Sequence, residues 1–337
     1  MANVPSPQDQ VVRMATEHWV SRYLYTAVEL KLADCLATGP QTAEEVAKTT
    51  ATHAPSLYRF LRTLASLGLF TEDAEHRFSL TALGETLRAG VPGSVRATVI
   101  IMAGEVLNFG LDNLRYSLET GKTGFEKATG LPLFEWLTRH PEEASLFSET
   151  MVGFHGAEPA AVAAAYDFSG LGTIVDVGGA TGNLLTTILG RHAGPRGVLF
   201  DLAHVVAEAP ALIASRGLAD RVRIEMGSFF EGVPAGGDAY VLSHVIHDWN
   251  EEQCLTILGH CRRAMKPGGR VLLVEMVLPG GDVPHPGKML DIIMLTAPGG
   301  QERTEAEYRV LLEKAGLRLT RVVPTESAVS VVEGGRA

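Results

Sequence analysis

The sequence predicts an α/β fold, in which a doubly wound, Rossmann-like parallel sheet follows an N-terminal α-helical and winged-helix region. From about Leu171 onward, short β-branched runs alternate with segments of helical periodicity. A glycine-rich turn follows the first of these runs directly, and a pattern of two helices and two short strands lies near the N-terminus. A length of 337 residues exceeds the usual size of one domain, so we expect more than one.

Composition and charge limit the possible partners. With 46% hydrophobic and 20% charged residues, the chain can bury a substantial core. A net charge of -10 argues against binding to nucleic acid or to an anionic membrane, since both require clustered Lys and Arg. The sequence shows neither a secretory leader pattern nor an apolar run of roughly 20 residues, so we expect a cytoplasmic protein with a small-molecule partner. The three cysteines lack paired spacing, so we expect buried thiols and no metal site at Cys35, Cys254 and Cys261.

The N-terminal region has two patterns. Between Gln8 and about Ala37, apolar residues recur three or four apart over a wide face, which fits a subunit contact and an ordinary core helix equally well. Thr42 with Glu45 marks a helix start, a second helix runs from about Ala54 to Leu67, and strands are expected at 69–71 and 77–80. This winged-helix pattern raises DNA binding as an alternative, but acids and bases are mixed along it. A structural or dimerising role is favoured.

The stretch from about Gly93 to Ala165 reads as a helical layer interrupted by glycine-containing loops at 121–124 and 130–132. Its large apolar residues fit plain core packing and also the lining of a pocket for a flat ligand. His155 beside them is either a polar contact or a packing residue. The apolar set comprises Met102, Phe109, Phe134, Trp136, Phe147, Met151 and Phe154.

The segment from Thr173 predicts a nucleotide site. A β-branched strand to Val177 leads into Gly178, Gly179 and Gly182, after which helical spacing begins. Glycines there let the backbone approach a ligand, and Asp201 ends the next strand about 20 residues later, as expected for a carboxylate that binds ribose hydroxyls. The glycines do not match GxGxxG, and Asp176 suits a cationic amino-acid moiety better than a pyrophosphate. We therefore favour S-adenosylmethionine.

Further strands are expected at 222–225, 239–243 and 270–275. His247 follows the second of these at the carboxyl edge of the sheet, where open α/β sheets bind ligands. Glu275 ends the third, and Glu302 lies in a loop before a late helix. Both acids are expected at the same edge as His247.

These motifs resemble those of the caffeic-acid-type plant O-methyltransferases and their bacterial natural-product relatives. The resemblance runs nearly end to end and is carried by Asp-Val-Gly-Gly at 176–179, His-Asp-Trp at 247–249, Lys-Pro-Gly-Gly at 266–269 and Gly-Gly-Gln-Glu-Arg-Thr at 299–304. It implies a class I methyltransferase domain, a homodimer formed through the N-terminal domain, and a role in secondary-metabolite biosynthesis. We divide the chain accordingly into a dimerisation domain (1–92), a connecting helical layer (93–170) and a catalytic domain (171–337).

The resemblance also implies residue roles. His247 would be the general base, and Glu275 and Glu302 would orient it. A base is needed because a phenol with a pKa near 10 must lose its proton as its oxygen attacks the methyl group. Ser228 and Phe229 would lie by the adenine, and Ser243 would lie by the cofactor tail. Plant members commonly have Asp at the position of Ser228 and Lys at the position of Ser243. Residues at positions that commonly line the acceptor site are Met151, Phe154, His155, Asp248, Asp291 and Met294.

The resulting hypothesis is methyl transfer to a hydroxyl group of a small aromatic acceptor. A non-methylating enzyme on the same scaffold, such as a hydroxylase or a rearrangement catalyst, is the alternative, because fold does not fix the reaction. A winged-helix DNA-binding regulator is the third reading.

Overall fold

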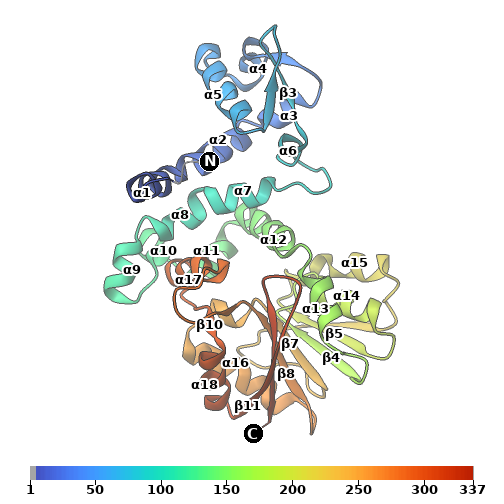
Figure 1. Cartoon of the computed structure of the whole chain (residues 1–337). Coiled ribbons are helices and arrows are strands. Elements are labelled where there is room, and N and C mark those ends of the chain that lie inside the picture. The colour runs from blue at the N-terminus through green and yellow to red at the C-terminus, as the bar shows by residue number, and fades with distance from the viewer. Residues whose placement is uncertain (1–4, 337) are drawn as a thin grey trace. The chain divides into compact units, whose positions relative to one another are not determined.

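The computed structural model describes residues 5–336, apart from the side chains of Val152, Phe154 and His155. The chain forms two compact units (Figure 1). One contains the chain up to Asp112 together with Phe134–Phe154. The other contains Asn113–Leu133 and the chain from His155 onward.

The first unit is helical, with a small antiparallel sheet in the order β1-β3-β2. The capping box expected at Thr42 and Glu45 is present and starts α4. The paired strands after α5 confirm the wing, and Gln41–Thr42 adds a strand that the sequence pattern did not predict. The elements are α1 (Pro7–Thr16), α2 (His18–Glu29), α3 (Leu32–Leu36), β1 (Gln41–Thr42), α4 (Ala43–Thr50), α5 (Ala54–Ser66), β2 (Phe70–Glu72), β3 (Arg77–Leu80), α6 (Ala82–Glu85), α7 (Arg96–Ala103), α8 (Glu105–Leu111), α11 (Leu133–Arg139) and α12 (Pro141–His155).

Helix α1 and the start of α2 expose their large apolar residues. None of the residues of α1, all of which are described, is buried. Val11, Val12 and Met14 are 65%, 62% and 71% exposed, and Trp19 at the start of α2 is 51% exposed. An apolar surface of this kind is typical of a protein–protein contact.

The second unit is built around a seven-stranded sheet in the order β11-β12-β8-β7-β4-β5-β6. Its elements are α9 (Leu114–Thr120), α10 (Gly124–Thr129), α13 (Glu158–Ala165), β4 (Thr173–Val177), α14 (Asn183–Arg191), β5 (Arg196–Asp201), η1 (Val206–Glu208), α15 (Ala209–Ser215), β6 (Val222–Met226), β7 (Ala239–Ser243), η2 (Ile246–Asp248), α16 (Glu251–Ala264), β8 (Arg270–Glu275), β9 (Val277–Leu278), α17 (Pro286–Thr296), β10 (Arg303–Thr304), α18 (Glu305–Lys314), β11 (Leu317–Pro324) and β12 (Ser330–Arg336).

Helices cover both faces of this sheet, which confirms the doubly wound prediction. Helices α13, α14 and α15 lie on one face and α16 and α18 on the other (Figure 1). Strands β4 to β8 pair in parallel, and helices connect β4 to β5, β5 to β6 and β7 to β8. The apolar residues of β4, β5, β7 and β8 are buried, whereas the edge strand β6 has no buried residue.

Tertiary pairing adds strands that the sequence pattern did not predict. Strand β12 pairs antiparallel with both β8 and β11, so the sheet is mixed rather than wholly parallel. Strands β9 and β10 form a separate two-residue parallel pair, in which Val277 lies opposite Arg303.

Among the described residues, no single helix is long and apolar enough to cross a membrane. One bent helix pair, Arg96–Leu111 with Leu114–Thr120, reaches the length and apolar composition of a membrane span only when its two helices are counted together.

Candidate active site

The carboxyl ends of four parallel strands bring the predicted polar residues to one edge of the sheet. Strand β4 ends beside the glycine loop, β5 ends at Asp201, β7 ends at Ser243 and β8 ends at Glu275. Because β7 lies between β4 and β8, the loop that carries His247 starts between the glycine loop and Glu275. This edge is where open α/β sheets bind their ligands.

The glycine loop is held close to the sheet by its own backbone. The Gly178 N–H donates to the carbonyl oxygen of Phe200 at 2.9 Å, so it serves β5 rather than pointing freely at a ligand. Gly178 and Gly182 have left-handed φ values of 71° and 79°. A Cβ atom on Gly179 would lie 2.5 Å from Cγ of Asp176, so the glycine permits the loop to pack directly over that acid.

Two carboxyl groups lie beneath and beside this loop. Asp176 is 1% exposed, and among the described residues only the backbone of Leu185 offers it a weak hydrogen bond. Burial, with the nearby charge of Asp201, raises the pKa of Asp176 to about 7. Asp201 accepts hydrogen bonds from the N–H groups of Ala180 (2.9 Å) and Leu202 (2.7 Å), while burial raises its pKa.

The residues expected near the adenine and the cofactor tail follow β6 and β7. Ser228 is half-buried, and its Oγ accepts a hydrogen bond from the Phe230 N–H at 3.2 Å. The ring of Phe229 packs edge-on against Phe230 and Trp249, at 4.9 and 5.9 Å between centroids, and lies 3.6 Å from the Cβ position of Gly178. Ser243 is half-buried at the end of β7.

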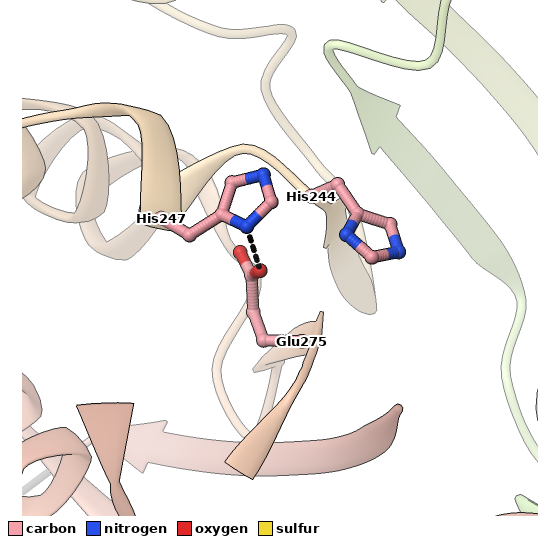
Figure 2. A group of neighbouring side chains, drawn as sticks. All are labelled: His244, His247 and Glu275. Carbon is pink, nitrogen blue, oxygen red and sulfur yellow. Dashed lines mark ion pairs between the residues drawn. The ribbon is translucent and has the colours of Figure 1, made fainter. Parts of the chain in front are cut away.

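The catalytic candidates come together around a short 3₁₀ helix, η2. His247 is 6% exposed, and its Nδ1 lies 2.7 Å from Oε1 of Glu302 and 3.6 Å from Oε2 of Glu275. On the other side of the ring, Nε2 lies 3.6 Å from Oδ1 of Asp248. Figure 2 shows the imidazole above the Glu275 carboxylate. The structure thus assembles all three residues that the sequence predicted as the base and its partners.

The carboxylates dominate the charge state of His247. Burial alone would lower its pKa, but Glu275, Asp248 and the hydrogen bond with Glu302 raise it to about 10. Burial in turn raises the pKa of Asp248 to about 6 and also raises that of Glu275. The acids around the ring therefore favour its protonated, imidazolium form.

Backbone packing brings Glu302 to this site. The β9–β10 pair begins just after Glu275 and Glu302, so it sets these two acids side by side. The Gln301 N–H donates to the carbonyl oxygen of His247 at 2.8 Å. A Cβ atom on Gly300 would lie 1.8 Å from that same oxygen, so only glycine allows the two loops to touch.

The predicted acceptor-site residues have different surroundings. Asp291 on α17 accepts a hydrogen bond from the Glu302 N–H at 2.8 Å, so it also supports the Glu302 loop. Met294 is 8% exposed on the same helix. Met151 is half-buried in the first compact unit. The side chains of Phe154 and His155 lie outside the described residues.

Several residues at the site were not singled out by the sequence patterns. The Arg303 guanidinium is buried and donates to the carbonyl oxygens of Ile246 (3.2 Å) and Gln301 (2.9 Å). The Cys254 thiol donates to the carbonyl oxygens of Ile246 and Trp249, both at 3.3 Å, and burial raises its pKa to about 11. Both side chains therefore fix the loop that carries His247. Cys254 and Cys261 confirm the prediction of buried thiols, whereas Cys35 is only half-buried.

His244 was also missed, although it stands in the same loop. It has a left-handed φ of 52°, its side chain is 6% exposed, and its Nε2 lies 2.7 Å from Oε2 of Glu158 at the start of α13. Its ring centroid is 5.2 Å from that of His247. The signal in the sequence was its position directly after β7, but its acid partner is 86 residues away along the chain.

Comparison with known protein families identifies the family of this chain. Residues 112–318 match the O-methyltransferase domain family, and residues 12–90 match the O-methyltransferase dimerisation domain. The chain belongs to the O-methyltransferase family. It is an S-adenosylmethionine-dependent methyltransferase, and the predicted class I fold with an N-terminal dimerisation domain is confirmed.

Individual relatives match over nearly the whole chain. The phenazine O-methyltransferase PhzM of Lysobacter antibioticus is 42% identical over 323 residues, covering 96% of this chain and 94% of the relative. The solved structure of LaPhzM has a TM-score of 0.92 at 42% identity, covering 99% of this chain and 100% of that one. An O-methyltransferase from neocarzinostatin biosynthesis, solved with S-adenosylmethionine and 2-hydroxy-5-methyl naphthoic acid, has a TM-score of 0.85 at 33% identity, with both chains fully covered (100%).

The residues at the sheet edge fit this cofactor. S-adenosylmethionine carries positive charge on its sulfonium and ammonium groups, and Asp176 is a buried acid with no ion-pair partner among the described residues. Asp201 stands at the end of the neighbouring strand, where a carboxylate binds ribose hydroxyls. The donor set therefore suits a cationic nucleoside.

Proposed function

We propose that this protein transfers a methyl group to a hydroxyl of a small aromatic, natural-product-like acceptor, with His247 as the general base. The observation that carries the proposal is the buried contact between His247 Nδ1 and Glu302, with Glu275 and Asp248 beside the ring. A histidine held by acids at a ligand-binding sheet edge is suited to removing a proton from a phenol.

Glu302 assigns the two ring nitrogens their roles. Because an ionised carboxylate only accepts hydrogen bonds, Glu302 at 2.7 Å requires a proton on Nδ1 of His247. The opposite nitrogen, Nε2, is then the atom that takes the proton from the acceptor hydroxyl. The imidazolium that results is stabilised by Glu275 and Asp248, which raise the pKa of His247.

The remaining roles follow from position. When bound, S-adenosylmethionine supplies an electrophilic methyl group on a sulfur that leaves as a neutral thioether. We propose that Asp201 binds its ribose hydroxyls, that Ser228 and Phe229 lie by its adenine, and that Ser243 lies by its tail. Asp176 lies almost fully buried beneath the loop, where the positive charge of the bound cofactor would favour its ionised form. The loop itself comprises Gly178, Gly179 and Gly182.

The acceptor class rests on the relatives. Relatives that are 36% to 42% identical are named for O-methylation in phenazine and mitomycin biosynthesis and of 3-amino-4-hydroxybenzoate. We propose that the acceptor here is likewise a flat aromatic molecule with a phenolic hydroxyl. The residues proposed to contact it are Met151, Phe154, His155, Asp248, Asp291 and Met294.

We also propose that the protein is a homodimer formed through its N-terminal region. Residues 12–90 match a dimerisation domain, and α1 exposes Val11, Val12 and Met14. The division into a dimerisation domain (1–92), a connecting layer (93–170) and a catalytic domain (171–337) belongs to the same proposal.

The test is methyl transfer from S-adenosylmethionine to a panel of phenazine, naphthoate and benzoate phenols and matched aryl amines, read by mass spectrometry. We expect phenols to gain one methyl group. His247→Ala should lower the rate by about 100- to 10,000-fold, the range for a lost general base, with cofactor binding retained. His260→Ala on α16 is the matched control. An unchanged rate in His247→Ala, or conversion of phenols without methyl gain, would contradict the proposal.

A further inference from the structure

The active-site edge holds more buried ligand groups for a cation than methyl transfer uses. One ligand atom from each of His244, His247 and Glu275 lies within 4.8 Å of the others, and all three residues are buried. Figure 2 shows the two imidazoles on the same side of the loop, with the Glu275 carboxylate beside them. Two imidazoles and one carboxylate form a donor set that Zn²⁺ commonly takes in proteins.

His244 is already oriented as a metal ligand usually is. Its Nε2 is held by Glu158 at 2.7 Å, which makes Nδ1 the atom that would bind the cation. In metal sites, a ligating histidine almost always has such a carboxylate partner, which fixes the ring and raises its basicity. His244 moreover holds a left-handed backbone, a conformation that few residues other than glycine adopt.

The local charge also favours a cation. Oε2 of Glu275 and Oε2 of Glu302 are both buried without a hydrogen-bond donor among the described residues. A buried carboxylate oxygen in this state is costly unless a positive charge lies near it. The proton on Nδ1 of His247, which lies 2.7 Å from Glu302 and 3.6 Å from Glu275, supplies part of that charge, and a divalent cation that displaces this proton would supply more.

We propose that His244, His247 and Glu275 form a binding site for a borderline divalent cation, Zn²⁺ or Co²⁺, and that the bound cation inhibits methyl transfer by occupying the catalytic histidine. Zn–N bonds of 2.0 to 2.1 Å require the ligand atoms to close to roughly 3.3 Å apart, a movement of about 1.5 Å at most. Glu302 stands beside His247 as a fourth ligand. Inhibition rests on the proposed role of His247, whereas binding itself does not.

Direct binding is tested first, with the full-length protein and Co²⁺ alone. We expect visible absorption typical of a four-coordinate Co²⁺ site, saturating at one ion per chain and displaced by Zn²⁺. His244→Asn, which suits a left-handed backbone, should abolish the band. Glu158→Gln should weaken binding by about 10- to 100-fold, the usual effect of losing the partner of a ligating histidine. The control is His260→Asn, which should bind as the wild type.

Inhibition is the second measurement. The Zn²⁺ concentration that halves each enzyme's own metal-free rate should rise at least about 10-fold in His244→Asn relative to the wild type. Retained S-adenosylmethionine binding by this variant shows that it is folded. Absence of the Co²⁺ band in the wild type, or an unchanged band in His244→Asn, overturns the site. A normal band without inhibition overturns the inhibitory role and, separately, argues against His247 as the base.

Discussion

Replacing Glu302 by Gln should lower the pKa of His247, the proposed catalytic base. The carboxylate lies 2.7 Å from Nδ1 of a buried His247, and it is among the causes that raise the pKa of this histidine from 6.5 to about 10. A hydrogen bond to a charged group contributes about 1.5–3 kcal/mol, and about 1.4 kcal/mol corresponds to one pKa unit. The base pKa seen in kcat/KM should therefore fall by about 1 to 2 in Glu302→Gln.

The assay is the dependence of kcat/KM for the acceptor on pH, with S-adenosylmethionine saturating and ionic strength constant. In the wild type, log(kcat/KM) should rise with a slope of about 1 through the neutral range, because one proton must leave the His247–phenol pair before transfer. In the variant the rise should end at lower pH. Its plateau should also be lower, by about 10- to 100-fold, since the tautomer and orientation of the ring are no longer fixed.

The control for this experiment is Glu305→Gln, which removes an exposed acid on α18 that pairs with Arg309. Its profile should overlay that of the wild type. A base pKa that stays the same or rises in Glu302→Gln, with cofactor binding intact, would refute the assignment of Glu302 as the hydrogen-bond acceptor that sets the charge of His247.

Three further predictions concern other parts of the chain. Asp176→Asn should become more stable than the wild type as the pH rises from 4 to 8. Folding raises the pKa of Asp176 from 3.8 to about 7, so its ionisation destabilises the native wild-type protein. This penalty is absent below pH 3.8 and reaches about 4 kcal/mol above pH 7. Thermal unfolding across pH measures this, and a pH-independent difference would contradict it. Gly300→Ala should lower kcat by at least about 100-fold, because its Cβ would lie 1.8 Å from the His247 carbonyl oxygen, whereas Gly190→Ala, with nothing within 4 Å, should leave kcat unchanged. Met14→Asp should shift the protein from dimer to monomer in light scattering, since the 71%-exposed side chain lies on the proposed interface; an unchanged mass would move the interface elsewhere.

Local patterns in the sequence were enough to predict the elements that depend on neighbouring residues. The strand at Thr173–Val177, the capping box at Thr42 and the glycine turn after β4 all stand where periodicity and turn chemistry predicted them. Strands buried on both faces carry a continuous apolar signal, and a capping box is a four-residue pattern, so neither needs long-range information. The position of His247 at the sheet edge followed in the same way, because the carboxyl ends of parallel strands share one edge.

Only the tertiary structure decided how distant residues meet. Glu302 reaches His247 because β9 pairs with β10 and because Gly300 lets the two loops touch. Glu158 reaches His244 across 86 residues, and β12 inserts antiparallel beside β8. These contacts depend on strand pairing and helix packing between segments far apart in the chain, and no local propensity encodes them. The sequence by itself determined the fold class and the place of His247 at the sheet edge, whereas tertiary packing decided how closely Glu275, Asp248 and Glu302 approach its ring.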